Sequence, residues 1–252
     1  MKDNFSTQAL TYAKHRPSYP TALFEYITSL VKHKKLAWDC GTGNGQSASE
    51  LSKYFEHVFA TDISAKQIEH AAKQDNITYA LEPAEKTSLA DSSTDLITIS
   101  QALHWFKFDE FYQEVKRVST PTGIIAAWTY SLLQVDEPTD AIIHKYHFET
   151  MGIYWDEERK YVDDRYEMIP FPFKQIETPA FHIEVNWGLD ELEGYFNTWS
   201  ALQKFIAANN YSPVPSLMDA IKQNWPASTV KKIIFPIHLK LGYVHGEFLQ
   251  DF

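Results

Sequence analysis

The stretch that decides the fold is residues 38–46, WDCGTGNGQ. Three glycines stand at alternate positions, Gly41, Gly43 and Gly45, and a short apolar segment precedes them. Glycine adopts positive φ and has no Cβ, so the backbone of such a loop can approach a ligand closely. The residues that follow read as a helix, whose N-terminal amides favour a negative or polar group. The stretch therefore predicts a strand, a ligand-binding turn and a helix in succession.

Strand-like and helix-like segments alternate through the first 130 residues. Short apolar runs predict strands at 35–40, 57–62, 76–81, 95–100 and 124–129, with helices at 44–55, 64–73 and 108–118. Such alternation predicts a parallel sheet with helices on both faces. Right-handed crossovers place the first three strands on one side and the fourth and fifth on the other. The crevice where strand order reverses then opens beside the first strand, at the glycine loop.

After residue 130 this rhythm breaks. Residues 181–187 alternate apolar and polar side chains, which predicts an antiparallel, half-exposed strand. Residues 189–208 read as one long amphipathic helix, and residues 233–246 as a last strand. Pro236 lies in that strand and cannot donate a backbone hydrogen bond, so it should mark the start, a bulge or an edge.

The pattern divides the chain into three parts. Residues 1–130 are expected to form a cofactor-binding α/β core with an N-terminal lid segment. Residues 131–178, rich in aromatic and charged side chains, are expected to form a helical insertion over the active site. Residues 179–252 are expected to supply the remaining strands, with a second helical insertion.

Composition narrows the class of protein. The chain has 252 residues, 44% of them hydrophobic, and a formal net charge of −10. Excess negative charge repels phosphate backbones and anionic lipid, so we expect neither a nucleic-acid nor a membrane partner. No apolar run is long enough for a membrane span, and residues 1–20 contain no signal-like apolar segment. The single cysteine, Cys40, fits a reducing compartment, and we expect a cytoplasmic protein.

Two acidic residues beside the loop restrict the class of ligand that the loop can bind. The dinucleotide fingerprint requires a glycine at position 46, where this chain has Gln46. Asp39, two residues before the first glycine, would repel a diphosphate but suits an ammonium or sulfonium group. Asp62 closes the second strand, where a carboxylate can accept hydrogen bonds from both hydroxyls of a ribose. An amino acid, a ribose and a sulfonium together describe S-adenosylmethionine.

Longer motifs carry a family resemblance. The stretches WDCGTGNGQSA, ATDIS, LEPAEKTSLADSSTDLITISQALHWF and GIIAAWTY resemble the class I S-adenosylmethionine-dependent methyltransferases. YAKHRPSYP and FNTWSA are similar to the small-molecule branch that includes trans-aconitate methyltransferase. The likeness covers residues 12–130 well and the remainder thinly. It implies a Rossmann-like α/β fold: a seven-stranded, mostly parallel sheet with an antiparallel last strand, helices on both faces and helical lid insertions. It also implies methyl transfer to a small-molecule acceptor such as a carboxylate.

The resemblance implies a set of cofactor-binding positions in the loops after successive strands and in the N-terminal segment. They are Tyr12, Arg16, Asp39, Cys40, Gly41, Thr42, Gly43, Asp62, Ile63, Ala84, Glu85 and Gln101. Two of them have simpler alternatives, since Asp39 could only brace the loop and Asp62 could only cap a helix. Cys40 reads as a small buried spacer within the loop.

Fewer residues can be assigned to the binding of the methyl acceptor. His104 is the best-placed base if the acceptor is an alcohol, an amine or a carbon acid; the alternative is a packed structural ring. Aromatic side chains suggest a pocket from which water is largely excluded: Tyr19, Trp105, Tyr130, Tyr154 and Trp199. A guanidinium group can bind a carboxylate through two hydrogen bonds, so Arg16, Arg159 and Arg165 are candidates to bind a carboxylate acceptor. The alternative for Arg159 and Arg165 is an ion pair with acidic side chains on the surface. No metal site is expected.

Two other functions remain open at this point. One is a nicotinamide-dependent oxidoreductase, and the other is a non-catalytic protein that binds S-adenosylmethionine. The identity of the acceptor and the oligomeric state are not encoded in any motif of the sequence.

Overall fold

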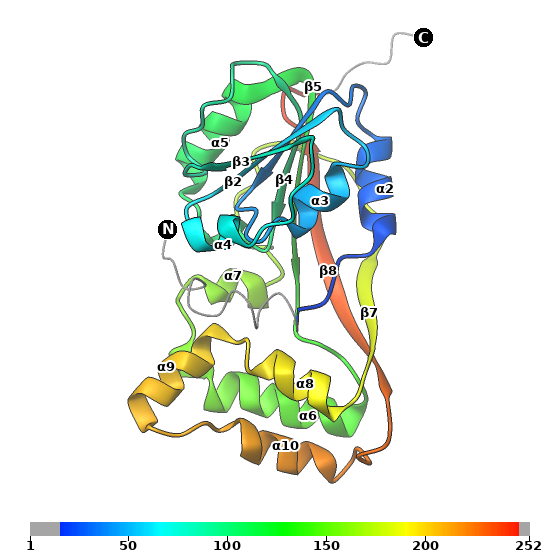
Figure 1. The fold of residues 1–252 in the computed structure, drawn as a ribbon, viewed down its shortest axis with the longest axis vertical. Coiled ribbons are helices and arrows are strands. Elements are labelled where there is room, and N and C mark those ends of the chain that lie inside the picture. Colours follow the sequence, from blue (N-terminus) through cyan, green and yellow to red (C-terminus); the bar gives the residue numbers. More distant parts are fainter. Residues whose placement is uncertain (1–15, 247–252) are drawn as a thin grey trace.

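The computed structural model describes residues 16–246, and its centre is one mixed sheet (Figure 1). The strand order is β3-β2-β1-β4-β5-β8-β6, with β7 also paired to β8. The parallel strands are β1 (Leu36–Cys40), β2 (His57–Asp62), β3 (Ile77–Leu81), β4 (Thr94–Ser100) and β5 (Ser119–Tyr130). The predicted strands and the reversal of order beside β1 are confirmed.

Helices cover both faces of this sheet. α2 (Thr21–Ser29) and α3 (Gln46–Leu51) pack on one face, while α5 (Phe108–Val118) packs on the other. α4 (Ala65–Glu69) follows β2, and α3 and α4 are shorter than the predicted helices. Successive residues of β5 alternate between the two cores, with Trp128 in one and Ala127 in the other. This burial of both faces explains the continuous apolar runs of the central strands.

Three antiparallel strands complete the sheet: β6 (Lys174–Gln175), β7 (Phe181–Trp187) and β8 (Lys231–Tyr243). The sheet therefore has eight strands where seven were expected, because the two-residue β6 adds an edge pairing to β8. β8 pairs with β5 and with β7, so the C-terminal part of the chain continues the sheet of the core. The division into three parts stays a prediction.

Pro236 lies in the interior of β8, opposite His182 of β7. Its carbonyl accepts a hydrogen bond of 3.0 Å from the amide of Ser131, on the side away from β7. The nitrogen and carbonyl of one strand residue point to the same side, so the missing N–H of Pro236 also faces away from β7. β5 ends at Tyr130, opposite Ile237, so proline costs no ladder bond here. On the side towards β5, Pro236 is therefore at an edge, as expected. On the side towards β7 it lies inside the paired strand.

The remaining helices gather at the carboxyl end of the parallel strands, in the lower half of Figure 1. They are α6 (Glu137–Lys145), the π-helical turn η2 (Tyr146–Thr150), η3 (Gly152–Tyr154), α7 (Arg159–Asp163), α8 (Leu189–Phe196), α9 (Ser200–Asn209) and α10 (Val214–Lys222). α6 contacts α10, α10 contacts α8, and α9 contacts η3. We call this group the helical layer.

The single helix predicted over 189–208 is wrong, since α8 and α9 are separate. Thr198 donates its hydroxyl to the carbonyl of Tyr195 at 2.6 Å, and Trp199 has an extended backbone. The break turns the Trp199 ring inward, where it is 3% exposed and contacts Tyr146, Trp155, Tyr195 and Phe196. Burial of this indole outweighs continuous helical hydrogen bonding. Within residues 16–246, no helix combines the length and apolar character that crossing a membrane requires.

Candidate active site

The candidate site lies where strand order reverses, at the carboxyl ends of β1 and β4. The loop after β1 carries the glycines, and the loop after β4 leads into the 3-10 helix η1 (Leu103–Trp105). All three loop glycines have positive φ, at 67° for Gly41, 56° for Gly43 and 79° for Gly45. This conformation accounts for glycine at each of these positions.

The three glycines serve different contacts. A Cβ on Gly41 would lie 2.6 Å from the Cβ of Ala102, in the loop after β4. A Cβ on Gly45 would collide with the hydroxyl of Tyr79, on β3. A Cβ on Gly43 would have no protein atom within 4 Å. Two glycines therefore allow protein to pack against the loop, while Gly43 borders open space into which a ligand can come.

Asp62 connects this loop to β2. Its Oδ2 accepts a hydrogen bond of 2.8 Å from the amide of Gly43, and its Oδ1 accepts one of 2.8 Å from the amide of Ser64. The residue is half-buried, and a carboxylate can accept about four hydrogen bonds. Asp62 thus ties the glycine loop to the end of β2, beside the crevice.

Asp39 lies beneath the loop and has no exposed surface. Its carboxylate accepts hydrogen bonds from the hydroxyls of Thr42, at 2.6 Å, and Thr98, at 2.8 Å. Burial raises the pKa of this carboxyl to about 6, although the two hydroxyl bonds lower it. This geometry matches the simpler alternative, in which Asp39 braces the loop, and a ligand would sense its charge through Thr42.

Cys40 is also fully buried, and its thiol forms no disulfide. Burial raises the pKa of the thiol, and the neighbouring charge of Asp39 raises it further. The thiolate is therefore disfavoured, and Cys40 serves as a small apolar spacer in β1.

The loops after β2 and β3 lie next to each other because those strands pair up to Asp62 and Leu81. Ile63 is partly exposed, Ala84 is buried, and Glu85 is partly exposed. Glu85 Oε1 accepts a hydrogen bond of 3.0 Å from the amide of Lys107, just before α5. Ile63, Ala84 and Glu85, which the resemblance assigns to the cofactor, are thus on adjoining loops.

Gln101 follows β4 directly and has a φ of 54°, which is unusual for a residue other than glycine. Its amide donates to the carbonyl of Trp128 at 2.9 Å, and its side-chain oxygen accepts a hydrogen bond from the hydroxyl of Thr129. These bonds to β5 hold a strained backbone at the mouth of the crevice. Strain of this kind, about 1–3 kcal/mol, often occurs at functional sites.

His104 is in η1 and is 8% exposed. Its Nδ1 lies 2.9 Å from the hydroxyl of Tyr166, which is fully buried. Burial lowers the pKa of His104 to about 3, and the charge of Arg159 contributes. The ring is therefore neutral at physiological pH. No motif indicates Tyr166, which lies 62 residues further along the chain.

Arg16 lies at the carboxyl end of β5. Its guanidinium donates to the hydroxyl of Tyr130 at 2.7 Å and lies 5.1 Å from the ring centroid of Tyr195. Tyr130 is the last residue of β5, and Tyr195 belongs to α8, so this contact joins the sheet to the helical layer. Tyr19 packs against the Tyr130 ring and edge-on against Trp128. The structure thus brings Arg16, Tyr19 and Tyr130 together.

The other predicted acceptor residues divide between the site and its surroundings. Trp105 packs against His104, with ring centroids 4.9 Å apart. Trp199 lies behind Tyr195, at 6.1 Å. Tyr154 packs on Phe205 of α9, away from the aromatic contacts of Arg16. Tyr12 lies outside the described residues.

Arg159 and Arg165 are placed differently from each other. Arg159 lies over the Trp155 ring at 4.6 Å and donates to Asp163 Oδ1 at 3.0 Å. Its charge lowers the pKa values of both His104 and Tyr195. Arg165 instead lines a hollow at the outer edge of β8.

These features can be tested against the expected cofactor. Open space at Gly43 and the half-buried carboxylate of Asp62 beside it fit a ribose and an amino-acid group lying across the loop. The buried, braced Asp39 places negative charge under the loop, which disfavours a diphosphate there. The residues present therefore fit S-adenosylmethionine. Sequence patterns did not indicate Tyr79, Tyr166 and Tyr195, because the roles of these residues depend on contacts between distant segments.

Comparison with known proteins agrees with this geometry. A family model for the methyltransferase domain matches residues 38–127. The chain is 36% identical to a protein of Dictyostelium discoideum described as a methyltransferase, over 95% of this chain and 94% of that one. It is 28% identical to a protein of Saccharomyces cerevisiae described as an S-adenosylmethionine-dependent methyltransferase, over 50% of this chain and 47% of that one. The structure of a protein of Anaeromyxobacter dehalogenans, described as a type II methyltransferase, superposes with a TM-score of 0.86 at 34% identity, covering 92% of this chain and 99% of that one.

Proposed function

The chain belongs to the family of S-adenosylmethionine-dependent methyltransferases, and from that premise we propose that it methylates a small carboxylic acid. The observation that carries the proposal is the position of Arg16. Its guanidinium lies between Tyr130 and Tyr195, at the carboxyl end of β5 and against the helical layer. A guanidinium fork matches a carboxylate, and the surrounding aromatic rings exclude water.

The residues that would hold the cofactor are those of the glycine loop and the strand end beside it. Gly43 leaves room for the ligand, Asp62 offers its carboxylate to the ribose hydroxyls, and Thr42 with Asp39 keeps the loop in shape. When bound, S-adenosylmethionine supplies a methyl group already activated by the sulfonium. The protein then has to align the acceptor and exclude water, and alignment can lower a barrier by about 7–11 kcal/mol.

The electrostatics of His104 favour an ionised acceptor over one that must lose a proton. A base with a pKa of about 3 is too weak to deprotonate an alcohol or an ammonium effectively near pH 7. A carboxylate acceptor is already anionic and needs no base. His104 would then contact the acceptor as a neutral hydrogen-bonding ring held by Tyr166.

Two structural contacts support the small-molecule branch that includes trans-aconitate methyltransferase. Arg16 comes from the stretch YAKHRPSYP, and Trp199 comes from FNTWSA. Both contact Tyr195, Arg16 at 5.1 Å and Trp199 at 6.1 Å. The two stretches that carry the branch resemblance thus meet at one ring, although they are distant in sequence. Arg159, whose charge also acts on Tyr195, offers a second cation for an acceptor with more than one carboxylate.

The alternatives are not favoured. A nicotinamide-dependent oxidoreductase would need a pyrophosphate over the loop, beneath which Asp39 lies. A non-catalytic role for this chain has no support from the named relatives, which are described as methyltransferases.

The proposal is tested by incubating the protein with methyl-labelled S-adenosylmethionine and separate panels of carboxylic acids, alcohols and amines. We expect label in an ester of one or more acids, preferentially those with two or three carboxylates. Arg16→Gln should raise the KM for that acid by about tenfold or more, since a charge-assisted hydrogen bond contributes about 1.5–3 kcal/mol. Lys145→Met, an exposed change on α6, is the matched control. Label transferred only to alcohols or amines would contradict the proposal.

A further inference from the structure

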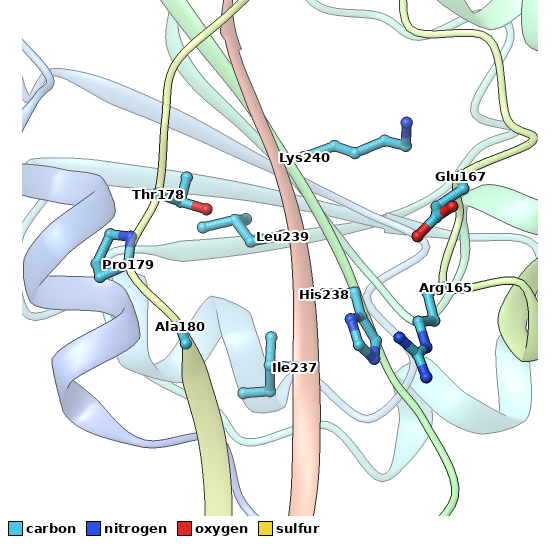
Figure 2. A pocket seen from close by; sticks show the side chains of 9 residues that line it. All are labelled: Arg165, Glu167, Thr178, Pro179, Ala180, Ile237, His238, Leu239 and Lys240. Atoms are coloured by element: carbon cyan, nitrogen blue, oxygen red, sulfur yellow. The ribbon is translucent and has the colours of Figure 1, made fainter.

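A hollow of about 340 Å³ lies along β8 (Figure 2), and none of its lining residues belongs to the glycine loop. Its lining includes four ionisable side chains, Arg165, Glu167, His238 and Lys240, and the segment 178–180 between β6 and β7. β7 pairs with β8 as far as Ile237, and β6 pairs with it from Gly242. The hollow therefore borders the part of β8 that lies between these two pairings, and no proposed cofactor residue lines it.

Arg165 is the unusual member of this group. Its guanidinium makes no hydrogen bond or ion pair with any residue between 16 and 246, although acids are plentiful in the segment around it. Figure 2 shows the guanidinium beside the ring of His238, and its charge acts on that ring. The Nε2 atom of His238 is buried and has no hydrogen-bond partner within the described part of the chain. Two polar groups thus adjoin the hollow without protein partners.

The other charges of the hollow largely balance. Lys240 lies over the Phe171 ring at 5.7 Å, and the carboxylates of Glu167 and Asp164 both act on it. Figure 2 shows the Glu167 carboxylate between the Lys240 chain and Arg165, with the guanidinium of Arg165 turned towards His238. At the His238 end the charge of Arg165 outweighs that of Glu167, which also acts on this ring.

The backbone holds Arg165 in this position. Arg165 and Tyr166 have φ values of 60° and 65°, two consecutive left-handed residues neither of which is glycine. Each costs about 1–2 kcal/mol relative to an ordinary conformation. The turn places Tyr166 inside, on His104, and leaves Arg165 outside, at the hollow. A single strained turn thus joins the hollow to the active site.

We propose that this hollow is a second binding site, for the oxyanion of a small carboxylate or phosphate, with Arg165 as its main ligand and His238 as the second. An oxyanion there accepts hydrogen bonds from the guanidinium fork of Arg165. It also accepts one from the N–H of the otherwise unpartnered Nε2 of His238. The site is independent of the acceptor contacts of Arg16, since it is built on β8 and on the turn after α7.

The test uses the full chain without methyl donor, titrated separately with inorganic phosphate and with malonate, to about 10 mM in each case. Histidine ring signals are followed by NMR, because His238 reports on the hollow and His104 on the active site. We expect one or both anions to shift the His238 signal. Arg165→Gln should weaken that response about tenfold or more, and Arg165→Lys should weaken it less, because it keeps the charge and loses the fork.

Arg165 is exposed, so these substitutions should leave the fold intact. Lys116→Met, at an exposed position on α5, is the control for a change of net charge. A response to phosphate alone or to malonate alone identifies the chemistry of the ligand. A His238 signal unmoved by both anions, or moved equally in Arg165→Gln, would overturn the proposal. A shift at His104 instead, abolished by Arg16→Gln, would place the anion in the acceptor site and leave the proposed function standing.

Discussion

The amide of Gly43 donates a hydrogen bond of 2.8 Å to the carboxylate of Asp62. This bond joins the loop after β1 to the end of β2, so the two elements proposed to hold the cofactor form one unit. A change at either residue should therefore affect the position of both elements.

Gly43→Ala should weaken binding of S-adenosylhomocysteine by about tenfold or more. The added methyl projects into the open space proposed for the ligand, and one extra group in a close-packed contact costs about 1–3 kcal/mol. Gly246→Ala is the matched control, since Gly246 also has positive φ and nothing within 4 Å of its Cβ. Both variants should lose similar stability, which thermal unfolding checks. Equal affinities in calorimetry would remove Gly43 from the ligand site.

Asp39→Asn should change how stability depends on pH. The pKa of Asp39 is raised by burial from 3.8 to about 6, so the folded state holds this proton more tightly than the unfolded chain. The folded wild type therefore loses stability as pH rises from about 4 to 6, by about 3 kcal/mol at most. The variant lacks this loss. Urea unfolding of both proteins across that pH range measures the difference, and parallel curves would show that Asp39 ionises normally.

Tyr166→Phe should alter His104 without emptying the site. It removes the hydrogen-bond partner of the buried Nδ1, which costs about 1–3 kcal/mol. We expect the NMR signals of His104 in the variant to differ from those in the wild type. In the wild type the ring should stay neutral down to about pH 4, because burial lowers the pKa of His104 to about 3. The matched control is Tyr112→Phe, which removes another tyrosine hydrogen bond, to the carbonyl of Pro170, and should leave the His104 signals in place. A His104 signal that titrates near pH 6.5 in the wild type would contradict this account.

The parallel half of the fold could be predicted from the sequence because its signals are local. Apolar runs marked β1 to β5, and the 3.6-residue repeat marked α5 with its observed bounds. The break between α8 and α9 could not be predicted, since it depends on Trp199 meeting Tyr146, a residue of η2. The short β6 carried no signal, because two residues establish no alternation.

The site was predictable in its loops and not in its cross-chain contacts. Glycines and a strand-end acid identify a ligand class by themselves, as at Gly43 and Asp62. The bond from Arg16 to Tyr130 spans 114 residues, and that from His104 to Tyr166 spans 62. No periodicity relates such positions. Asp39 illustrates the remaining difficulty, since a carboxylate beneath a loop and one at its surface look alike in sequence.

The central claim is that the glycine loop and Asp62 hold a sulfonium nucleoside, and calorimetric titration with S-adenosylhomocysteine tests it most directly. The account predicts binding at one site per chain, weakened about tenfold or more in Asp62→Asn by loss of charge-assisted bonds, and unchanged in Asp75→Asn, an exposed position. NADH should give no heat. Absence of binding to S-adenosylhomocysteine by the folded protein, or equal affinity in Asp62→Asn, would contradict the account.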